Sequence, residues 1–240
     1  MAASHGKRLT SPRSSAAHSE LKRVLYGRRK GRKLKGGRKA AYETLLPALA
    51  IPAGDAPLDP RALFARPVAD VWVEIGFGSG EHLAAQAAAH PDIGFLGAEP
   101  FENGIAALLT LVGAGSLANI RIWQDDVRLL LARLPDASIG RLFVLFPDPW
   151  PKARHHKRRI IGPTTIPEFA RVMKDGAELR FASDAADYVN WARGHMAEPP
   201  GFVLASDRRG ADWPETRYEA KARAAGRACS YLAWRKKPCG

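Results

Sequence analysis

The stretch VWVEIGFGSG, residues 71–80, decides the fold. Val71–Ile75 is a nearly continuous apolar run, as expected for a strand covered on both faces. It leads directly into a turn with glycine at positions 76, 78 and 80, and an Ala-rich helix is predicted over Glu81–His90. A strand, a tight turn and a helix in this order predict a βα unit whose ligand site lies at the carboxyl end of the strand.

The same alternation continues along the chain on both sides of this unit. Further strands are predicted at 93–98, 119–123, 141–146 and 177–182, and helices at 101–112, 127–134, 164–173 and 187–196. Strands at 202–205 and 228–234 come late and could pair with each other. Upstream, 41–49 is predicted as a short helix and 52–67 as a loop. Such alternation predicts an α/β fold with a mostly parallel sheet.

Composition and charge limit the possible partners. The 240 residues are 46% hydrophobic and lack an apolar run near the ~20 residues that span a bilayer, so we expect a soluble, cytoplasmic chain without a membrane partner. The two cysteines match no disulfide or metal framework, and no metal is expected. Residues 1–40 carry 13 of the 37 Lys and Arg and one of the 24 acids, a net +12 of the total +13.

This distribution predicts two parts: a basic, flexible N-terminal arm over 1–40 and a domain over 41–240. Residues 1–20 are expected to be disordered, and 21–40 to be extended or ordered on contact. Nucleic acid is the favoured partner of the arm, because clustered cations bind phosphates and release counterions. The alternatives are that the arm is a targeting peptide or that it has neither role.

Acidic residues recur where the predicted strands end. Glu74 lies within the first strand, and acids follow the next four strands at Glu99, Asp125 and Asp126, Asp148, and Asp184. Helix capping could explain one of them, most readily Asp184, but explains all of them less well.

The glycine turn limits the class of ligand that the site can bind. A dinucleotide fingerprint needs glycine at position 81, where this chain has Glu81, and a carboxylate there repels a pyrophosphate. A nucleoside cofactor without phosphates fits better. Gly76 and Gly78 would allow close approach, Glu99 would take the ribose hydroxyls, and Asp125 or Asp126 would contact the adenine. The acids also suit the positive charges of S-adenosylmethionine.

The segment LFPDPWPKARHHKRRII, residues 145–161, joins an acid and an aromatic to a basic cluster. Five cations occur in it without an acid among them: Lys152, Arg154, Lys157, Arg158 and Arg159. The pattern indicates delivery of a polyanion to a chemical site. The alternative is a proline-rich loop before a solvated helix start. Trp150 is expected to be packed rather than stacked on a base.

At these motifs the chain closely resembles the bacterial tRNA (guanine-N7)-methyltransferase family. The resemblance covers about residues 24–237 and rests on five motifs and the segment YGRRKGRKL at Tyr26–Leu34. The motifs are EIGFGSG at Glu74–Gly80, GAEP at Gly97–Pro100, FPDPWPKARHHKRR at Phe146–Arg159, FASD at Phe181–Asp184 and TRYEAKARAAG at Thr216–Gly226. It implies a Rossmann-like, mostly parallel seven-stranded sheet with helices on both faces.

The resemblance also implies an activity and its residues. The activity is methyl transfer from S-adenosylmethionine to N7 of the variable-loop guanosine, position 46, of tRNA. Glu74, Glu99, Asp125 and Asp148 would contact the cofactor, with Asp126 left open as the alternative to Asp125, and Asp148 would be the catalytic residue. The substrate guanosine would be held by Lys152, Asp184, Thr216, Arg217, Tyr218 and Glu219. Arg154, Lys157, Arg158 and Arg159 would contact the tRNA backbone.

Guanine N7 carries a lone pair and no proton, so Asp148 is expected to orient the base and act electrostatically. From the residues alone, Thr216 with Glu219 could equally be a helix N-cap. Competing functions are a methyltransferase of another RNA or of a protein, an RNA-binding module with a vestigial pocket, and a dinucleotide oxidoreductase. A monomer and a homodimer are both compatible with the sequence.

Overall fold

A seven-stranded sheet forms the centre of the molecule in the computed structural model, which describes residues 25–198 and 201–238. The disorder expected of residues 1–20 lies outside these ranges. The strands are β1 (Asp70–Ile75), β2 (Ile93–Ala98), β3 (Ile120–Trp123), β4 (Ile139–Leu145), β5 (Met173–Ser183), β6 (Phe202–Ser206) and β7 (Ser230–Lys236). The helices are α1 (Gly36–Leu49), α2 (Glu81–Ala89), α3 (Glu102–Gly115), α4 (Val127–Leu131), α5 (Ile166–Val172), α6 (Ala186–Ala197) and α7 (Arg217–Ala224), with short 3-10 helices at Arg61–Leu63 (η1) and Ala153–Arg158 (η2).

The strand order is β3-β2-β1-β4-β5-β7-β6, which places β4 in the middle of the sheet and β1 beside it. β1 pairs in parallel with β2 and β4, and β5 continues the parallel run beside β4. β7 lies antiparallel to both β5 and β6, so the two late strands do pair. The predicted α/β fold with a mostly parallel sheet is confirmed.

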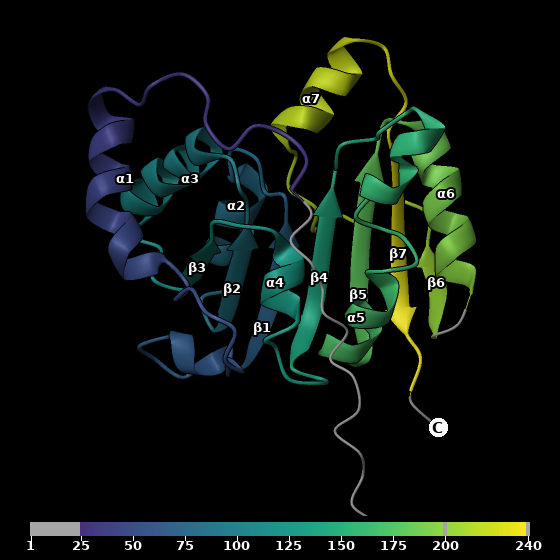
Figure 1. Cartoon of the computed structure of the whole chain (residues 1–240), viewed down its shortest axis with the longest axis horizontal. Helices are drawn as coiled ribbons and strands as arrows, with labels where there is room; N and C mark the ends of the chain where they lie inside the picture. The colour runs from purple at the N-terminus through teal and green to yellow at the C-terminus, as the bar shows by residue number, and fades with distance from the viewer. Residues whose placement is uncertain (1–24, 199–200, 239–240) are drawn as a thin grey trace, which may run out of the picture.

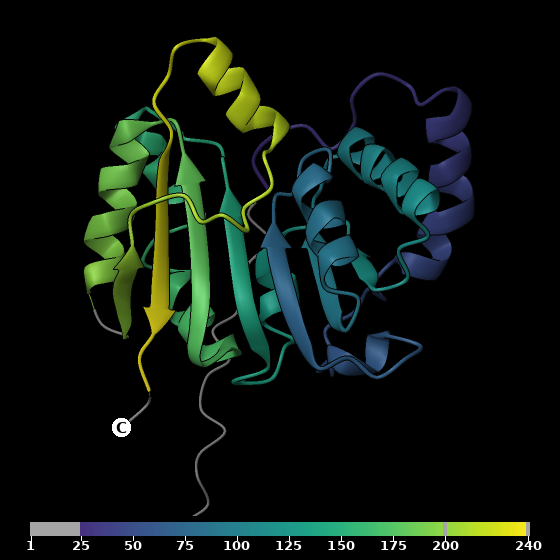
Figure 2. The same cartoon turned by 180° about the vertical axis from the view of Figure 1, so that it is seen from behind.

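Helices cover the two faces unequally. α4, α5 and α6 pack on one face along most of the sheet (Figure 1), and α2 and α3, with α1 beside them, cover the other face over β1 to β3 (Figure 2). Successive side chains of β1 point to opposite faces of the sheet. Val73 and Ile75 therefore pack in the core under α4, α5 and α6, and Trp72 packs in the core under α2 and α3. α7 stands above the carboxyl edge of the sheet in both views.

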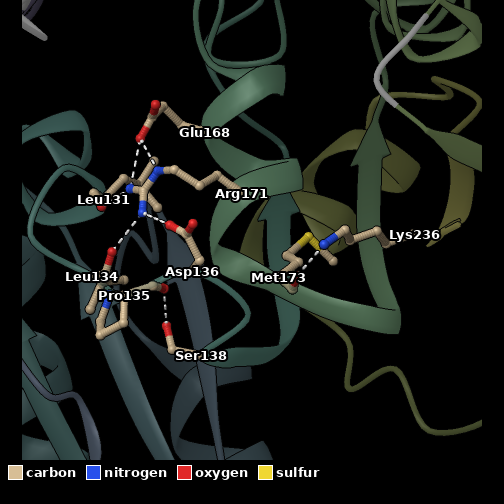
Figure 3. Close-up of polar contacts among 9 residues, drawn as sticks. All are labelled: Leu131, Leu134, Pro135, Asp136, Ser138, Glu168, Arg171, Met173 and Lys236. Carbon is tan, nitrogen blue, oxygen red and sulfur yellow. Dashed lines mark hydrogen bonds and ion pairs between the residues drawn. The ribbon is translucent and has the colours of Figure 1, made fainter. Parts of the chain in front are cut away.

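Side chains from α5 and β7 secure the opposite edge, as Figure 3 shows. Arg171 donates to the carbonyl of Leu131, the last residue of α4, at 2.7 Å, and to the carbonyl of Leu134, three residues beyond it, at 2.8 Å. From β7, Lys236 donates to the Met173 carbonyl at 2.8 Å. The Leu131 carbonyl also accepts from the Leu134 N–H at 3.1 Å, so the bonds from Arg171 add to this turn and tie the end of α4 to α5. This edge is therefore stabilised away from the carboxyl ends of the strands.

Several boundaries differ from the predictions: α4 ends at Leu131 rather than Leu134, for example, and β5 begins four residues before the predicted Ala177. α1 begins at Gly36, inside the segment expected to be extended. The helix predicted to end at Met173 ends at Val172, and β5 begins at once with Met173 paired to Ile139. Pairing with β4 overrides the local helical preference there. Within the described ranges, no helix is both long and apolar enough to cross a membrane.

Candidate cofactor and substrate site

A cavity of about 580 Å³ opens where β1, β2, β3 and β4 end. This volume lies within the range of small-molecule sites. Nine of the predicted site residues line it: Gly76, Gly78, Glu99, Asp125, Asp126, Asp148, Arg158, Arg217 and Tyr218. The strand-end acids are thus brought together at one place, with the exceptions described below.

The glycine turn forms one wall and leaves the backbone accessible. Gly78 has φ of 58°, which favours glycine, and a Cβ there would lie 3.0 Å from the Tyr218 ring. On its other side the turn meets α3, since a Cβ at Gly104 would come within 2.3 Å of the Gly78 carbonyl oxygen. Tyr218 and α3 therefore enclose the turn closely.

Glu99 is held rigidly at the end of β2. Its Oε2 accepts from the Gly78 N–H and its Oε1 from the Phe101 N–H, both at 2.9 Å. Burial raises the pKa of this carboxyl to about 7, and the charge of Asp148 adds to the rise, while the two N–H donors oppose it. Glu99 thus presents a carboxyl group in a fixed orientation at the cavity wall.

The two acids after β3 play different parts. Asp126 is buried, caps α4 by accepting from the Arg128 N–H at 3.0 Å, and pairs with the Arg128 guanidinium at 3.2 Å. Asp125 lies at the cavity wall with a partly exposed side chain, 3.9 Å from the guanidinium of Arg29. Because capping already uses Asp126, this geometry favours Asp125 as the adenine contact.

Asp148 lies between two residues in strained conformations. Phe146 and Trp150 have φ of 50° and 44°, and for residues other than glycine such angles cost about 1–3 kcal/mol each. Asp148 itself is exposed at the cavity wall, and partial desolvation raises the pKa of its carboxyl above the usual range. The strained loop therefore turns this carboxylate to the opening, where a substrate would arrive.

Glu74 is placed differently from the prediction. It is 3% exposed, does not line the cavity, and bonds the Nδ1 of His82 on α2 at 2.7 Å. Its side chain points to the face of β1 that α2 covers, since Val73 and Ile75 on either side face the other core. The direct cofactor contact expected of Glu74 is not supported by this arrangement.

The basic segment after β4 divides into exposed and buried cations. Lys152, Arg154 and Lys157 are exposed. Arg158 reaches the cavity with its guanidinium over the rings of Tyr26 (4.3 Å) and Trp150 (4.8 Å), so Trp150 is packed, as expected.

Arg159 requires a correction. It is 2% exposed, donates to the Pro149 carbonyl at 2.9 Å, pairs with Asp187, and packs on Tyr188 and Trp191. A guanidinium buried in this way anchors the segment to α6 and is not available to a phosphate backbone. We therefore remove Arg159 from the predicted tRNA contacts.

The TRYE motif begins α7. Thr216 caps this helix by accepting from the Glu219 N–H at 3.0 Å, which confirms the capping interpretation. Glu219 is buried and accepts from Arg209 and Tyr231, whereas Arg217 and Tyr218 face the cavity. Of this motif, Arg217 and Tyr218 are placed to meet a ligand. Asp184 lies outside the cavity wall and accepts from Arg227 at 2.6 Å.

The segment 25–32 was predicted as part of the nucleic-acid-binding arm and not as part of the cofactor site, yet its first residues line the cavity. Its backbone is fixed to α3: Glu102 N–H donates to the Arg29 carbonyl, Gly31 N–H to Asn103 Oδ1, each at 2.9 Å, and Asn103 Nδ2 to the Arg32 carbonyl. Tyr26 stands edge-on to Trp150 at 5.8 Å. The sequence signal that could have identified this segment as part of the site is Tyr26, an aromatic residue beside a run of cations. Within the described ranges, no group of three or more potential metal ligands occurs.

Comparison with known proteins decides the family. A family described as "Putative methyltransferase" matches residues 68–232. A tRNA (guanine-N(7)-)-methyltransferase of Rhodospirillum rubrum is 50% identical over 89% of this chain and 88% of its own length. The chain belongs to the tRNA (guanine-N7)-methyltransferase family. The resemblance predicted from the motifs is confirmed.

Further relatives agree. The tRNA (guanine-N(7)-)-methyltransferase of Paramagnetospirillum magneticum is 50% identical over 89% of this chain and 92% of its own. Among solved structures, the 16S rRNA methyltransferase KamB aligns with a TM-score of 0.53 at 20% identity, covering 71% of this chain and 89% of its own. The last likeness concerns the fold alone.

Proposed function

We propose that this member of the family transfers the methyl group of S-adenosylmethionine to N7 of the variable-loop guanosine, position 46, of tRNA. The observation that carries the proposal is the cavity in which Glu99 is fixed by two backbone N–H groups and Asp148 is exposed at the wall. The names of relatives 50% identical to this chain support the substrate.

The cavity fits the proposed cofactor. Glu99 keeps acceptor capacity on both oxygens for ribose hydroxyls, since each oxygen has accepted one bond and has a second lone pair. Asp125 lines the cavity, which supports it as the partner of the adenine amino group, and the glycine turn exposes its backbone at the same wall. The acids Glu99, Asp125 and Asp148 suit a cationic ligand better than a pyrophosphate.

The residues of the chain then orient the guanine base and stabilise the positive charge that develops on it. When bound, S-adenosylmethionine supplies a methyl group on a positively charged sulfur. Guanine N7 can attack it directly with its lone pair, so no proton has to be removed. Asp148 favours the positive charge that develops on the guanine ring, and Tyr218, 53% exposed above Gly78, offers a ring on which the base can stack.

Exposed cations occur on elements that contribute to the cavity wall. Arg154 and Lys157 on η2 and Arg217 on α7 are solvent-exposed, and α1 carries Arg38 at the cavity wall. Such a surface attracts a phosphate backbone irrespective of base sequence. Of the basic arm over 1–40, for which nucleic acid is the expected partner, residues 1–24 lie outside the described ranges.

The test is methyl transfer from labelled S-adenosylmethionine to unmodified tRNA, followed by cleavage mapping of N7-methylguanosine. The expected result is one modified guanosine, in the variable loop, with no label on a transcript whose position 46 is adenosine. Label elsewhere in the tRNA would overturn the assigned position. Cofactor binding without transfer to any tRNA would favour an RNA-binding module instead.

A further inference from the structure

A hydrogen bond beneath the glycine turn joins the two elements that the turn connects. Glu74 lies in β1, two residues before Gly76, and His82 is the second residue of α2, two residues after Gly80. The Nδ1 of His82 lies 2.7 Å from Glu74 Oε2, and the two residues are 2% and 3% exposed. The bond therefore spans the turn from inside the core.

The turn needs such support because its own backbone is permissive. Gly76, Gly78 and Gly80 all have positive φ, of 70°, 58° and 82°. Glycine has the largest conformational freedom of all residues, so a turn with three of them has a wide choice of shapes. The turn contains one backbone hydrogen bond of its own, from the Gly80 N–H to the Phe77 carbonyl at 2.9 Å, and contacts from outside the turn must fix the rest.

The selected shape matters at a single backbone group. The Gly78 N–H points to Glu99 at 2.9 Å, which orients the acid proposed to hold the cofactor ribose. The Gly76 N–H is fixed separately by the Ala98 carbonyl of β2, at 2.8 Å. The Glu74–His82 bond sets the distance between the start of the turn and the helix that follows it, and so sets where Gly78 stands.

Burial makes this bond hard to replace. A carboxylate in the interior without a partner is strongly unfavourable, so removing His82 leaves Glu74 uncompensated. His82 is confined in turn by Phe143, whose ring lies 4.8 Å away edge-on. Among the described residues, the second ring nitrogen of His82 has no hydrogen-bond partner, so the bond to Glu74 is the polar contact that orients the imidazole.

We propose that Glu74 and His82 are positioning residues for cofactor binding. Their hydrogen bond sets the shape of the glycine turn, and Glu74 acts on the cofactor through this turn rather than by contact. This role rests on the proposed function, because it presupposes that S-adenosylmethionine occupies the cavity.

Substitutions of matched shape separate positioning from direct contact. Glu74→Gln keeps an acceptor for the His82 N–H but removes the charge, and His82→Asn keeps a donor at the place of Nδ1. Glu74→Leu and His82→Leu remove the bond. Asn119→Ala is the control: it removes bonds to the carbonyls of Ala87 and His90 at the other end of α2, so it weakens the same helix away from the cavity.

The dissociation constant of S-adenosylmethionine is measured by calorimetry on the full chain, beside the melting temperature. We expect Glu74→Leu and His82→Leu to weaken binding about tenfold or more, as for small displacements of an organised site. Glu74→Gln and His82→Asn should bind nearly as well as the wild type. Asn119→Ala should lower the melting temperature but leave the affinity unchanged. The double leucine variant should be no weaker than the worse single one, because each removes the same bond.

Two outcomes overturn the inference. Binding by Glu74→Gln as weak as that of Glu74→Leu would mean that the charge itself touches the cofactor. Unchanged affinity in His82→Leu would remove His82 from the mechanism, and if that variant does not fold, His82→Asn and Glu74→Gln still decide between positioning and contact. Failure of the wild type to bind S-adenosylmethionine would instead sink the proposed function, a result distinct from both.

Discussion

Glu99 Oε2 accepts a hydrogen bond from the Gly78 N–H at 2.9 Å, which joins the acid at the end of β2 to the glycine turn after β1. The acid is buried, and its pKa is raised to about 7 because desolvation outweighs the two N–H bonds that it accepts. A ligand that donates further hydrogen bonds to the charged form would lower this pKa again. If Glu99 holds the ribose as proposed, cofactor binding and ionisation of Glu99 are linked.

Cofactor affinity should depend on pH through Glu99. With a pKa of about 7, this carboxyl is mostly protonated at pH 6 and mostly ionised at pH 8. If ribose hydroxyls donate to the ionised form, affinity for S-adenosylmethionine should fall about tenfold between pH 8 and pH 6. Calorimetry in buffers of different ionisation enthalpy should also show proton release on binding at pH 6.5. Glu99→Gln is the control and should bind weakly with a flat profile; an equally flat profile in the wild type would contradict the linkage.

The same shift predicts how stability varies with pH in the absence of cofactor. In the window from 4.5 to about 7 the folded state holds more protons at Glu99 than the unfolded state does. Stability from this group is therefore greatest at low pH, falls as pH rises through the window, and is absent above it. Glu99→Gln should raise the melting temperature relative to the wild type at pH 8 more than at pH 5. A difference independent of pH would assign the effect to packing.

The fold was predictable because the apolar runs and the glycine turn are local signals. The central strand over 71–75 and the helix from Glu81 were placed within a residue of their bounds. The start of α1 at Gly36 was missed because two glycines and several cations favour an extended segment locally, while contacts of α1 with α3 and β3 support the helix. Tertiary packing decides such weak helices.

The sequence was enough to predict which acidic residues lie near the candidate site, but not the directions in which their side chains point. Sequence places Glu74 and Glu99 at adjacent strands, yet residue alternation turns Glu74 under α2 and leaves Glu99 in the cavity. Likewise Arg158 and Arg159 are neighbours with opposite environments, because α6 provides the anion and the aromatic ring that hold Arg159. Partners far along the chain decide these orientations, and no local pattern reports them.

The charge of Asp148 should matter for turnover more than for cofactor binding. Asp148→Asn keeps the size and hydrogen-bonding capacity of the side chain but removes the charge that favours a positive guanine ring. We expect kcat to fall about 10²-fold or more, with little change in the affinity for S-adenosylmethionine. Single-turnover transfer at saturating tRNA measures this. Asp136→Asn is the matched control, since Asp136 lies outside the cavity wall at the opposite edge of the sheet and pairs with Arg171. Unchanged turnover in Asp148→Asn would exclude a role for the charge.

The exposed and buried cations of the basic segment should differ in tRNA binding. Replacing Arg154 or Lys157 by alanine should reduce the slope of log affinity against log salt by about one for each phosphate contact that the substitution removes. Arg159→Lys should leave this slope unchanged and lower the melting temperature, because its buried guanidinium serves Pro149 and Asp187. Filter binding between low and moderate salt checks the slopes. A reduced slope in Arg159→Lys with normal stability would restore Arg159 as a backbone contact.

The segment 25–32 should depend on Gly31 for its place against the domain. At Gly31 a Cβ would lie 2.6 Å from Asn103 Oδ1 and 2.8 Å from Phe101 Cζ, and the same Asn103 oxygen accepts the Gly31 N–H. Gly31→Ala should therefore displace the segment from α3, and trypsin should cleave at Arg28 to Lys33 several times faster. Gly37→Ala is the control, because a Cβ there meets nothing within 4 Å and alanine stabilises a helix by about 1 kcal/mol relative to glycine. Equal cleavage rates in the two variants would show that the contacts with Asn103 and Phe101 do not hold this segment in solution.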